Sequence, residues 1–302
     1  MKSLLLYLIL CLLFLVNCTT NSTPQDDCTE LQEILLYISQ KDGKFDIFKN
    51  NLQGQETKLT QNQGYDWYPH WNPTLKSIIY NAYEGDTFRI KNMDLEGHQL
   101  VFSTNGLEEY NLSPNGEKLV AQISEGDFSK LTITDTNGNN PIDITDAKAY
   151  NGRAKWSPDS QSILYISDRD GNNEIYLYSL KDQSTRRLTQ NVTNEKYCSW
   201  APDSKRFAYT TQYYEEGKPD RNDVFVMSLE SGQTVQITQN IYDDSEIAWS
   251  PISDRIAFHS KRDTIDHIFT MKSDGTDIQQ ISTANTYHGE PNWAIIEVKC
   301  EL

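Results

Sequence analysis

Short apolar runs alternate with polar turns along most of the chain, and no apolar stripe recurs at helical spacing. In one typical stretch, Trp156 is followed by the turn Ser-Pro-Asp-Ser at 157–160 and by the apolar run 163–166. Polar turns separate this run from two further segments, 174–178 and 185–189. Proline presets the backbone of a tight turn, and short continuous apolar runs indicate strands covered on both faces. The stretch therefore predicts four short antiparallel strands.

A hydrophobic anchor opens this stretch and recurs along the chain, with proline two residues later in five of six copies. The anchors are Trp71, Leu112, Trp156, Trp200, Trp249 and Trp293. They are spaced by 41, 44, 44, 49 and 44 residues. A period of this length with four strands per repeat is typical of a β-propeller. We predict that the anchors pack blade against blade and do not bind a ligand.

The two chain ends together supply one blade. The N-terminal segments 34–39, 45–48 and 57–60 match a second, third and fourth strand but have no anchor before them. The C-terminal copy at Trp293 has the anchor but lacks those strands. Joining them removes two exposed strand edges. We therefore predict an all-β fold over residues 30–302, a six-bladed propeller with four antiparallel strands per blade, closed by N- and C-terminal strands that share a blade.

The first residues predict a targeting segment. Residues 1–17 carry the positive charge of Lys2 near their start and contain an apolar run of 13 residues at 4–16, which is too short to span a bilayer and is typical of a signal peptide. The sequence Leu-Val-Asn-Cys ending at Cys18 resembles the bacterial lipobox, which implies lipidation of Cys18. Residues 18–29 then form a polar tether. The alternative is ordinary secretion with cleavage nearby.

Charge and cysteines limit the partners and the compartment. The formal net charge of -16 argues against binding nucleic acid or docking on anionic lipid. Export implies an oxidising compartment, where disulfides persist. Cys28 and Cys300 flank the shared blade, so we expect them to form a disulfide, the alternative being two free thiols. Cys198 has no evident partner and is expected to be a small buried side chain.

The repeat Trp-Ser-Pro-Asp-x-x-x-Ile-x-Tyr-x-Ser, with Ser-Asp-Arg-Asp-Gly at 167–171 and Leu-Thr at 188–189, resembles the TolB-type (PD40/WD40-like) propeller repeat. The resemblance covers about residues 30–299 and implies the propeller fold. TolB proteins carry a separate N-terminal α/β domain, which we expect this chain to lack. Because one fold hosts many functions, the activity has to be argued from the site.

Chain direction predicts where that site lies. The connections between blades and the turns from second to third strands fall on one face, and the residues before each anchor ring the mouth of the central channel. Aromatic and charged residues on such loops are candidates for ligand recognition. The binding candidates are Trp67, Tyr68, His70, Glu109, Arg153, Glu195, Tyr197, Tyr214, Asp244, Glu246, His288 and Glu290.

No catalytic or cofactor motif is present in the sequence, so we expect no cofactor. The sequence favours a monomeric, non-catalytic propeller, lipid-anchored in the bacterial cell envelope at the outer membrane facing the periplasm, that binds a protein or peptide. One alternative is a metal-assisted glycan lyase or hydrolase, because His70, His288 and Glu290 could hold a divalent metal and some related propellers that cleave acidic polysaccharides use a His-bound metal. A third possibility is a scaffold whose only role is envelope assembly.

Overall fold

The computed structural model describes residues 28–41, 43–61, 64–84, 87–100, 109–214, 216 and 221–299. The chain divides into two units, Glu33–Ile295 and a smaller one made of Met1–Gln32 and Ile296–Leu302. Within the described part, no helix has the length and apolar character needed to cross a membrane. The predicted signal peptide, Cys18 and most of the tether lie outside the described residues.

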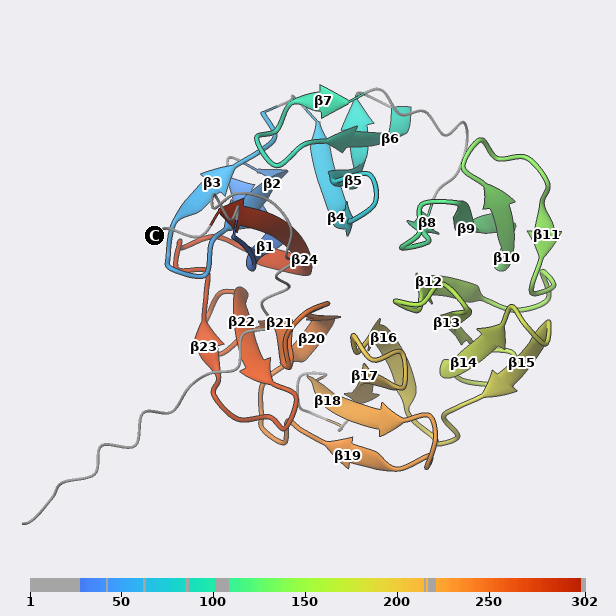
Figure 1. Cartoon of the computed structure of the whole chain (residues 1–302). Helices are drawn as coiled ribbons and strands as arrows, with labels where there is room; N and C mark the ends of the chain where they lie inside the picture. Colours follow the sequence, from blue (N-terminus) through green and yellow to red (C-terminus); the bar gives the residue numbers. More distant parts are fainter. Residues whose placement is uncertain are drawn as a thin grey trace, which may run out of the picture. The chain divides into compact units, whose positions relative to one another are not determined.

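Four kinds of strand repeat in chain order (Figure 1). The inner strands are β4 (Tyr65–Asn72), β8 (Glu109–Leu112), β12 (Asn151–Trp156), β16 (Asn194–Trp200), β20 (Asp244–Trp249) and β24 (His288–Lys299). The second strands are β1 (Thr29–Lys41), β5 (Ser77–Glu84), β9 (Lys118–Glu125), β13 (Ser162–Ser167), β17 (Arg206–Tyr213) and β21 (Arg255–Ser260). The third strands are β2 (Lys44–Asn50), β6 (Thr87–Met93), β10 (Phe128–Asp135), β14 (Glu174–Ser179), β18 (Arg221–Ser228) and β22 (His267–Lys272). The outer strands are β3 (Glu56–Lys58), β7 (Gln99–Leu100), β11 (Ile142–Asp143), β15 (Ser184–Arg187), β19 (Thr234–Gln236) and β23 (Gln279–Gln280).

These strands form six four-stranded antiparallel sheets, and the sheet β24-β1-β2-β3 combines both chain ends. We call it blade 1 and number the others along the chain, so that blade 2 is β4–β7 and blade 6 is β20–β23. The predicted six-bladed propeller and its shared blade are therefore confirmed. Cys28 is disulfide-bonded, but Cys300 lies outside the described residues, so their pairing stays a prediction.

The outer strands are shorter than predicted because a side-chain hydroxyl, and not a backbone carbonyl, accepts the hydrogen bond that would extend the sheet. In blade 4, Thr189 was expected in the last strand, but its hydroxyl accepts the Ile175 N–H at 2.8 Å, while Leu188 N–H reaches the Ile175 carbonyl. Thr60, Thr145, Thr238 and Ser282 accept the equivalent N–H in four other blades. The side chain thus satisfies a buried backbone donor where the sheet ends.

The anchor tryptophans join neighbouring blades, as predicted. The five of them are at most 7% exposed, and the core clusters that contain Trp156, Trp200, Trp249 and Trp293 draw side chains from two adjacent blades. The Trp156 indole N–H donates to the main-chain carbonyl of Asn111 in the preceding blade at 3.0 Å, and Trp200 and Trp293 make the same contact with Lys155 and Ala248. Burial of a large ring and a directional hydrogen bond therefore act at one contact.

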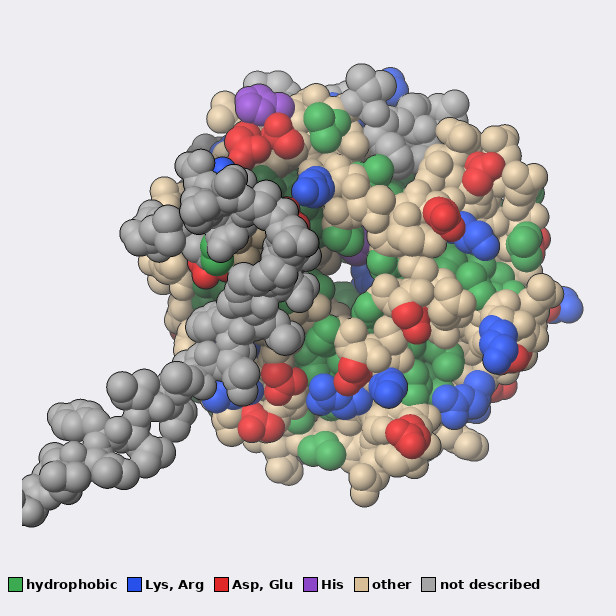
Figure 2. Space-filling view, viewed as in Figure 1, with side chains coloured by type: hydrophobic (Ala, Val, Ile, Leu, Met, Phe, Trp, Pro, Cys, Tyr) green, Lys and Arg blue, Asp and Glu red, His purple; other side chains and the backbone are tan. Residues whose placement is uncertain are grey.

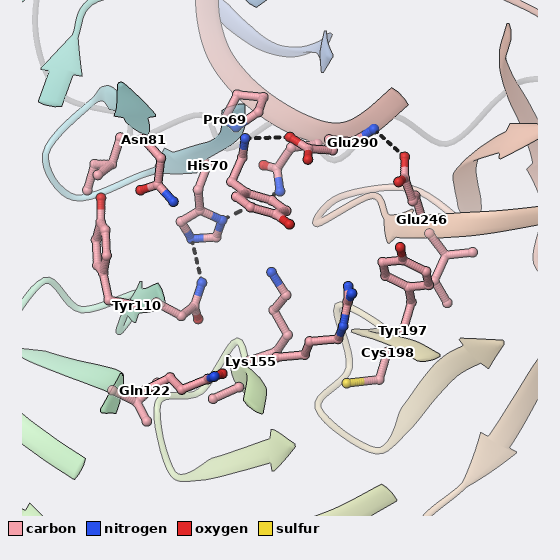
Figure 3. Close-up of a pocket in the computed structure, with 18 of the residues that line it drawn as sticks. Pro69, His70, Asn81, Tyr110, Gln122, Lys155, Tyr197, Cys198, Glu246 and Glu290 are labelled. Carbon is pink, nitrogen blue, oxygen red and sulfur yellow. Dashed lines mark hydrogen bonds between the residues drawn. The ribbon is translucent and has the colours of Figure 1, made fainter. Parts of the chain in front are cut away.

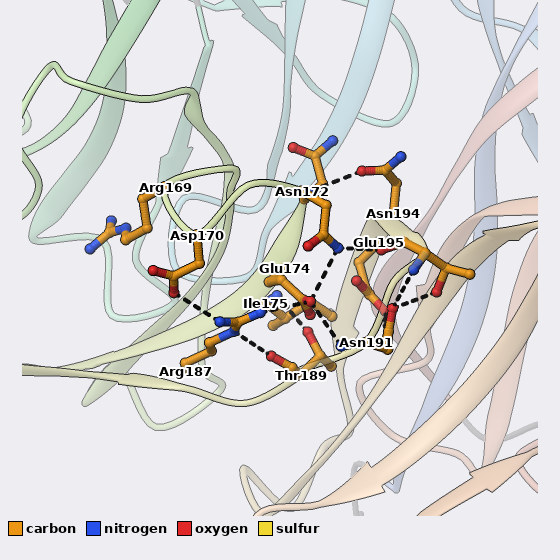
Figure 4. A network of polar contacts seen from close by, with 12 residues as sticks. Arg169, Asp170, Asn172, Glu174, Ile175, Arg187, Thr189, Asn191, Asn194 and Glu195 are labelled. Atoms are coloured by element: carbon orange, nitrogen blue, oxygen red, sulfur yellow. Dashed lines mark hydrogen bonds and ion pairs between the residues drawn. The ribbon is translucent and has the colours of Figure 1, made fainter.

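A pair of fully buried carboxyl groups joins blades 4 and 5 (Figure 4). Glu174 accepts from Arg187 at 2.9 Å and from the Asn191 N–H at 3.0 Å, and Glu195 accepts from the Asn191 side chain at 2.7 Å. The second oxygen, Oε2, of each carboxyl has no donor among the described residues. Burial raises the pKa of Glu195 to about 8, and repulsion and hydrogen bonding by Glu174 add to this effect. Because Glu174 pairs with Arg187, the carboxyls share one proton that resides on Glu195.

Replacing Trp156 by Phe is expected to destabilise the protein by about 1 kcal/mol more than replacing Trp71 by Phe. Both substitutions remove similar ring area, but only the Trp156 indole N–H has a carbonyl partner, whereas Trp71 Nε1 is buried with no partner among the described residues. Urea unfolding of the two variants measures the difference. Equal losses would show that the indole hydrogen bond contributes nothing to joining the blades.

Glu195→Gln is expected to reduce the pH dependence of stability. The folded-state pKa of Glu195 is about 8 and its usual value is 4.5, so the free energy of unfolding falls as pH rises through this window. The glutamine amide donates to Glu174 Oε2 without a proton to lose, so the variant should be the more stable protein at the alkaline end. Urea titrations across the window test this. A variant less stable than wild type at the alkaline end, with an unchanged pH slope, would contradict the shared proton.

Candidate functional site

A β-bulge in the inner strands decides which side chains reach the channel. We number these residues backward from the anchor, so that Tyr68 is position -3 of Trp71. In β4, Trp67 pairs with Asn81 and His70 pairs with Ile79, so the inner strand has one residue more than its neighbour. The same shift occurs in β12 and β20, and one residue earlier in β16. The extra residue turns position -5 to the face of the anchor and directs position -3 to the channel mouth.

Position -3 combines charged and aromatic side chains with an unusual backbone. Four residues at this position have positive φ: Tyr68 (53°), Arg153 (54°), Glu246 (49°) and Glu290 (53°). Tyr197 occupies the position in blade 5 and is not among the positive-φ residues, in keeping with the displaced bulge of its strand. Left-handed backbone is costly for residues other than glycine, and it is concentrated at functional sites.

The acidic members of this ring are linked through the backbone. Glu246 Oε2 accepts the Glu290 N–H at 2.7 Å, and Glu290 Oε2 accepts the Tyr68 N–H at 2.5 Å. Gly289 makes this packing possible, because a Cβ there would lie 2.7 Å from Glu246 Oε2 and would collide with the Tyr287 hydroxyl. The two carboxylates thus fix the mouth across blades 6, 1 and 2.

The opposite side of the mouth is basic. Figure 3 shows the Lys155 side chain directed into the channel and the Tyr197 ring next to Glu246. The guanidinium carbon of Arg153 lies 4.2 Å from the centre of the Tyr197 ring, within the range of a cation–π contact. Acidic side chains from blades 6 and 1 therefore face basic side chains from blade 4 across one opening.

These side chains line a pocket of about 130 Å³ at the mouth. Its floor contains His70, which lies between two side-chain amides: Asn111 Nδ2 is 3.2 Å from Nε2, and Asn292 Nδ2 is 3.5 Å from Nδ1. Asn111 Oδ1 accepts the Trp156 N–H, so its amide nitrogen faces the ring and Nε2 accepts. Burial, and then the charge of Lys155, lower the pKa of His70 to about 3. His70 is therefore neutral at physiological pH.

Water has little access to the acidic side of the mouth, and this burial raises the pKa of Glu290 and Tyr287. Burial and repulsion by Glu246 raise the pKa of Glu290 to about 8, although its backbone partner at Tyr68 and the charges of Arg153 and Lys155 act in the opposite direction. Burial and the same two carboxylates raise the pKa of Tyr287. At neutral pH the acidic side of the mouth thus holds a proton that a bound cation can displace.

An aromatic cluster adjoins the mouth on blades 1 and 2. The Phe45 ring lies 5.3 Å from Trp67, 5.6 Å from Tyr287 and 6.2 Å from Tyr65, measured between ring centres. Tyr65 is 42% exposed and Trp67 is 37% exposed. Aromatic side chains left in solvent at a pocket edge are typical of binding surfaces.

The structure separates the twelve predicted binding residues. Six line the pocket, namely Tyr68, His70, Arg153, Tyr197, Glu246 and Glu290. Trp67 lies in the aromatic cluster, and Tyr214 is 79% exposed but does not line the pocket. The Glu109 side chain is outside the described part.

Three predicted residues occupy position -5 and are fully buried between blades, contrary to the expectation that they ring the mouth. Glu195 belongs to the carboxyl pair, Asp244 accepts from Ser260 at 2.5 Å, and the His288 ring stacks on His267 with centres 5.6 Å apart. For Glu195 and Asp244 the bulge explains the difference, because it turns this position to the face of the anchor. Conversely, sequence reasoning missed Lys155 at position -1, although the same count from the anchor identifies it.

His259 has neighbours of the types found in a hydrolase triad. It lies 3.1 Å from Ser245 Oγ through Nδ1 and 2.8 Å from Asp266 Oδ1 through Nε2. Ser245 is 5% exposed, pairs with His259 across adjacent strands and does not line the pocket, so the Ser245 contact joins β20 to β21 and the Asp266 contact joins β21 to the residue before β22. In the described residues, no three His, Cys, Asp or Glu side chains are placed to hold a metal ion.

A second cavity of about 420 Å³ opens on the other side of His70 and Lys155. Its walls are the anchors and the prolines that follow them, including Pro158 and Pro202. Figure 2 shows an opening near the centre of one face, with hydrophobic side chains gathered around it. Cys198 lines both cavities as a free thiol and is 3% exposed, in agreement with the predicted small buried side chain, and burial raises its pKa to about 12.

Comparison with known proteins shows which family model and which relatives the chain resembles. Residues 109–218 match the family model PD40, described as a TolB beta propeller domain. The Tol-Pal system protein TolB of Helicobacter hepaticus is 25% identical over 179 residues, which are 58% of this chain and 43% of that protein. This chain therefore spans less than half of that relative.

Two solved structures share the fold. TolB from Acinetobacter baumannii aligns with a TM-score of 0.72 at 20% identity over 86% of this chain and 66% of that one. A putative TolB from Agrobacterium tumefaciens aligns with a TM-score of 0.66 at 17% identity over 90% of this chain and 100% of that one. With the repeat and the six observed blades, these matches show that the chain contains a TolB-like, PD40-type six-bladed β-propeller.

Proposed function

We propose that this protein is a non-catalytic binding propeller of the cell envelope that recognises a protein or peptide at its channel mouth. The observation that carries the proposal is the ring at position -3, where left-handed backbone holds charged and aromatic side chains around one pocket. Folding does not need strained residues of these types at a solvent opening, so a binding role accounts for them. The match to a Tol-Pal system protein supports a protein partner.

The proposed location is the bacterial envelope, with lipid on Cys18 anchoring a monomer to the outer membrane on its periplasmic side. The apolar segment 4–16 and the lipobox-like sequence support export and anchoring. The disulfide at Cys28 is typical of an oxidising compartment. The net charge of -16 makes nucleic acid an unsuitable partner.

The alternative of a metal-assisted glycan lyase or hydrolase lacks an assembled site in the described residues. It requires His70, His288 and Glu290 to coordinate the same metal ion. His70 lies on the channel floor between two amides, whereas His288 is fully buried against His267. We therefore favour binding over this chemistry.

Substituting the exposed aromatic residues of the mouth is expected to abolish partner binding without loss of stability. The test variant is Trp67→Ala with Tyr68→Asn, because asparagine tolerates the positive φ at position 68. The control is Ile142→Ala, which removes a 58% exposed apolar side chain from an outer strand. Full-length proteins serve as bait in envelope extract, and captured proteins are quantified by mass spectrometry.

A protein retained by wild type and by the Ile142 variant should fall by about tenfold or more with the mouth variant. Equal unfolding midpoints exclude misfolding as the cause. Retention of every captured protein by the mouth variant would contradict recognition at the mouth.

A further inference from the structure

We propose that Glu246 and Glu290 bind one lysine or arginine side chain, which the protein partner inserts into the channel mouth. This inference rests on the proposed function and adds the chemistry of the anchor. It starts from the unused hydrogen-bonding capacity of the two acids. Oε2 of each acid accepts a hydrogen bond from a backbone N–H, and neither Oε1 has a hydrogen-bond partner among the described residues.

The charges around the pair leave room for a cation. Within the described residues, Glu246 has one ion-pair contact, with His259 at 3.8 Å, and Glu290 has none. Arg153 stacks on Tyr197, and the charges of Arg153 and Lys155 act on Glu290 by lowering its pKa. Two carboxylates linked by one backbone N–H therefore offer two oxygens to the pocket, and N–H groups of a ligand cation are suitable donors for both.

Size and lining favour a single side chain. The pocket has a volume of about 130 Å³. A cavity of about 150 Å³ holds one benzene molecule, so this pocket holds one side chain and no larger element. Tyr68, Tyr110 and Tyr197 contribute aromatic surface to its wall, which suits the aliphatic stem of lysine or arginine and supports the charged end.

Binding of a cation is coupled to release of a proton. The groups around Glu290 include the Glu246 carboxylate, the Tyr68 N–H, Arg153, Lys155 and the phenols of Tyr197 and Tyr287, and its pKa is about 8. A lysine or arginine lowers this pKa by charge attraction, so the proton leaves when the cation enters. The affinity is therefore expected to rise with pH toward 8 and to level off above it.

The test uses the full-length protein and the pentapeptides acetyl-Gly-Gly-Xaa-Gly-Gly-amide, where Xaa is Arg, Lys, norleucine or Glu. Ligand-observed NMR gives the dissociation constants. Arg and Lys peptides are expected to bind at least about tenfold more tightly than the norleucine peptide, and the Glu peptide is expected not to bind. Their affinity should increase with pH in wild type and not in Glu290→Gln.

Three variants identify the site. Glu246→Gln and Glu290→Gln keep the acceptors for the backbone N–H groups and should each remove most of the preference for Arg over norleucine. Glu230→Gln removes an exposed acid from the turn between β18 and β19 and should leave the preference unchanged. Unfolding midpoints confirm that all three variants are folded.

Equal binding of the Arg and norleucine peptides, or a preference that survives both mouth substitutions, would overturn the cation anchor. If envelope capture still depends on Trp67 and Tyr68 in that case, the proposed function stands and only its anchor is wrong. If the peptides bind as expected and no captured protein depends on the mouth, the pocket binds cations but the proposed function fails.

Discussion

The contact between an anchor indole and the main chain of the preceding blade is the constraint on which the other features depend. The indole N–H reaches the carbonyl of the residue before the previous anchor, so each such contact fixes a short inner strand relative to its neighbour. Backbone amides add a second link, because Trp156 N–H donates to the Asn111 side chain and Trp249 N–H to Ser199. Each of these links joins a main-chain group of one inner strand to a side chain of its neighbour.

Residues at different positions of the inner strands lie at different levels around the channel. Position -5 is buried between blades, position -3 forms the mouth, and position -1 forms the floor, which separates the mouth pocket from the cavity lined by tryptophan and proline. Each level has its own chemistry. Buried polar groups such as Glu174 and Glu195 connect blades, whereas charged groups such as Glu246 and Arg153 line the mouth pocket. One strand therefore contributes to the contacts between blades and to the pocket through different residues.

The fold could be predicted from the sequence because the anchor of the repeat recurs six times along the chain. Anchor spacing, turn chemistry and the two incomplete end copies predicted the blades, their number and their closure. The site was predicted less completely, because the sequence alone does not show which residues before an anchor point into the channel. A one-residue bulge has no mark in a single sequence, and it turns Glu195 and Asp244 inward while Glu246 stays at the mouth.

The aromatic cluster was beyond sequence reasoning for a different reason. Phe45 and Tyr287 are far apart in the chain and meet only when the ends share a blade. Glu246, Glu290 and Tyr68 likewise come from three blades, and their hydrogen bonds depend on the placement of two backbone amides. Pairwise contacts of this kind arise from tertiary structure and have no local pattern.

The left-handed backbone at the mouth also limits how this protein can diversify. Tyr68, Arg153, Glu246 and Glu290 line the mouth pocket and all have positive φ, so the backbone restricts which side chains can replace them. Positive φ excludes valine, isoleucine and threonine and favours asparagine, aspartate and glycine. The ring can therefore change by single substitutions only within the set of residues that tolerate left-handed backbone.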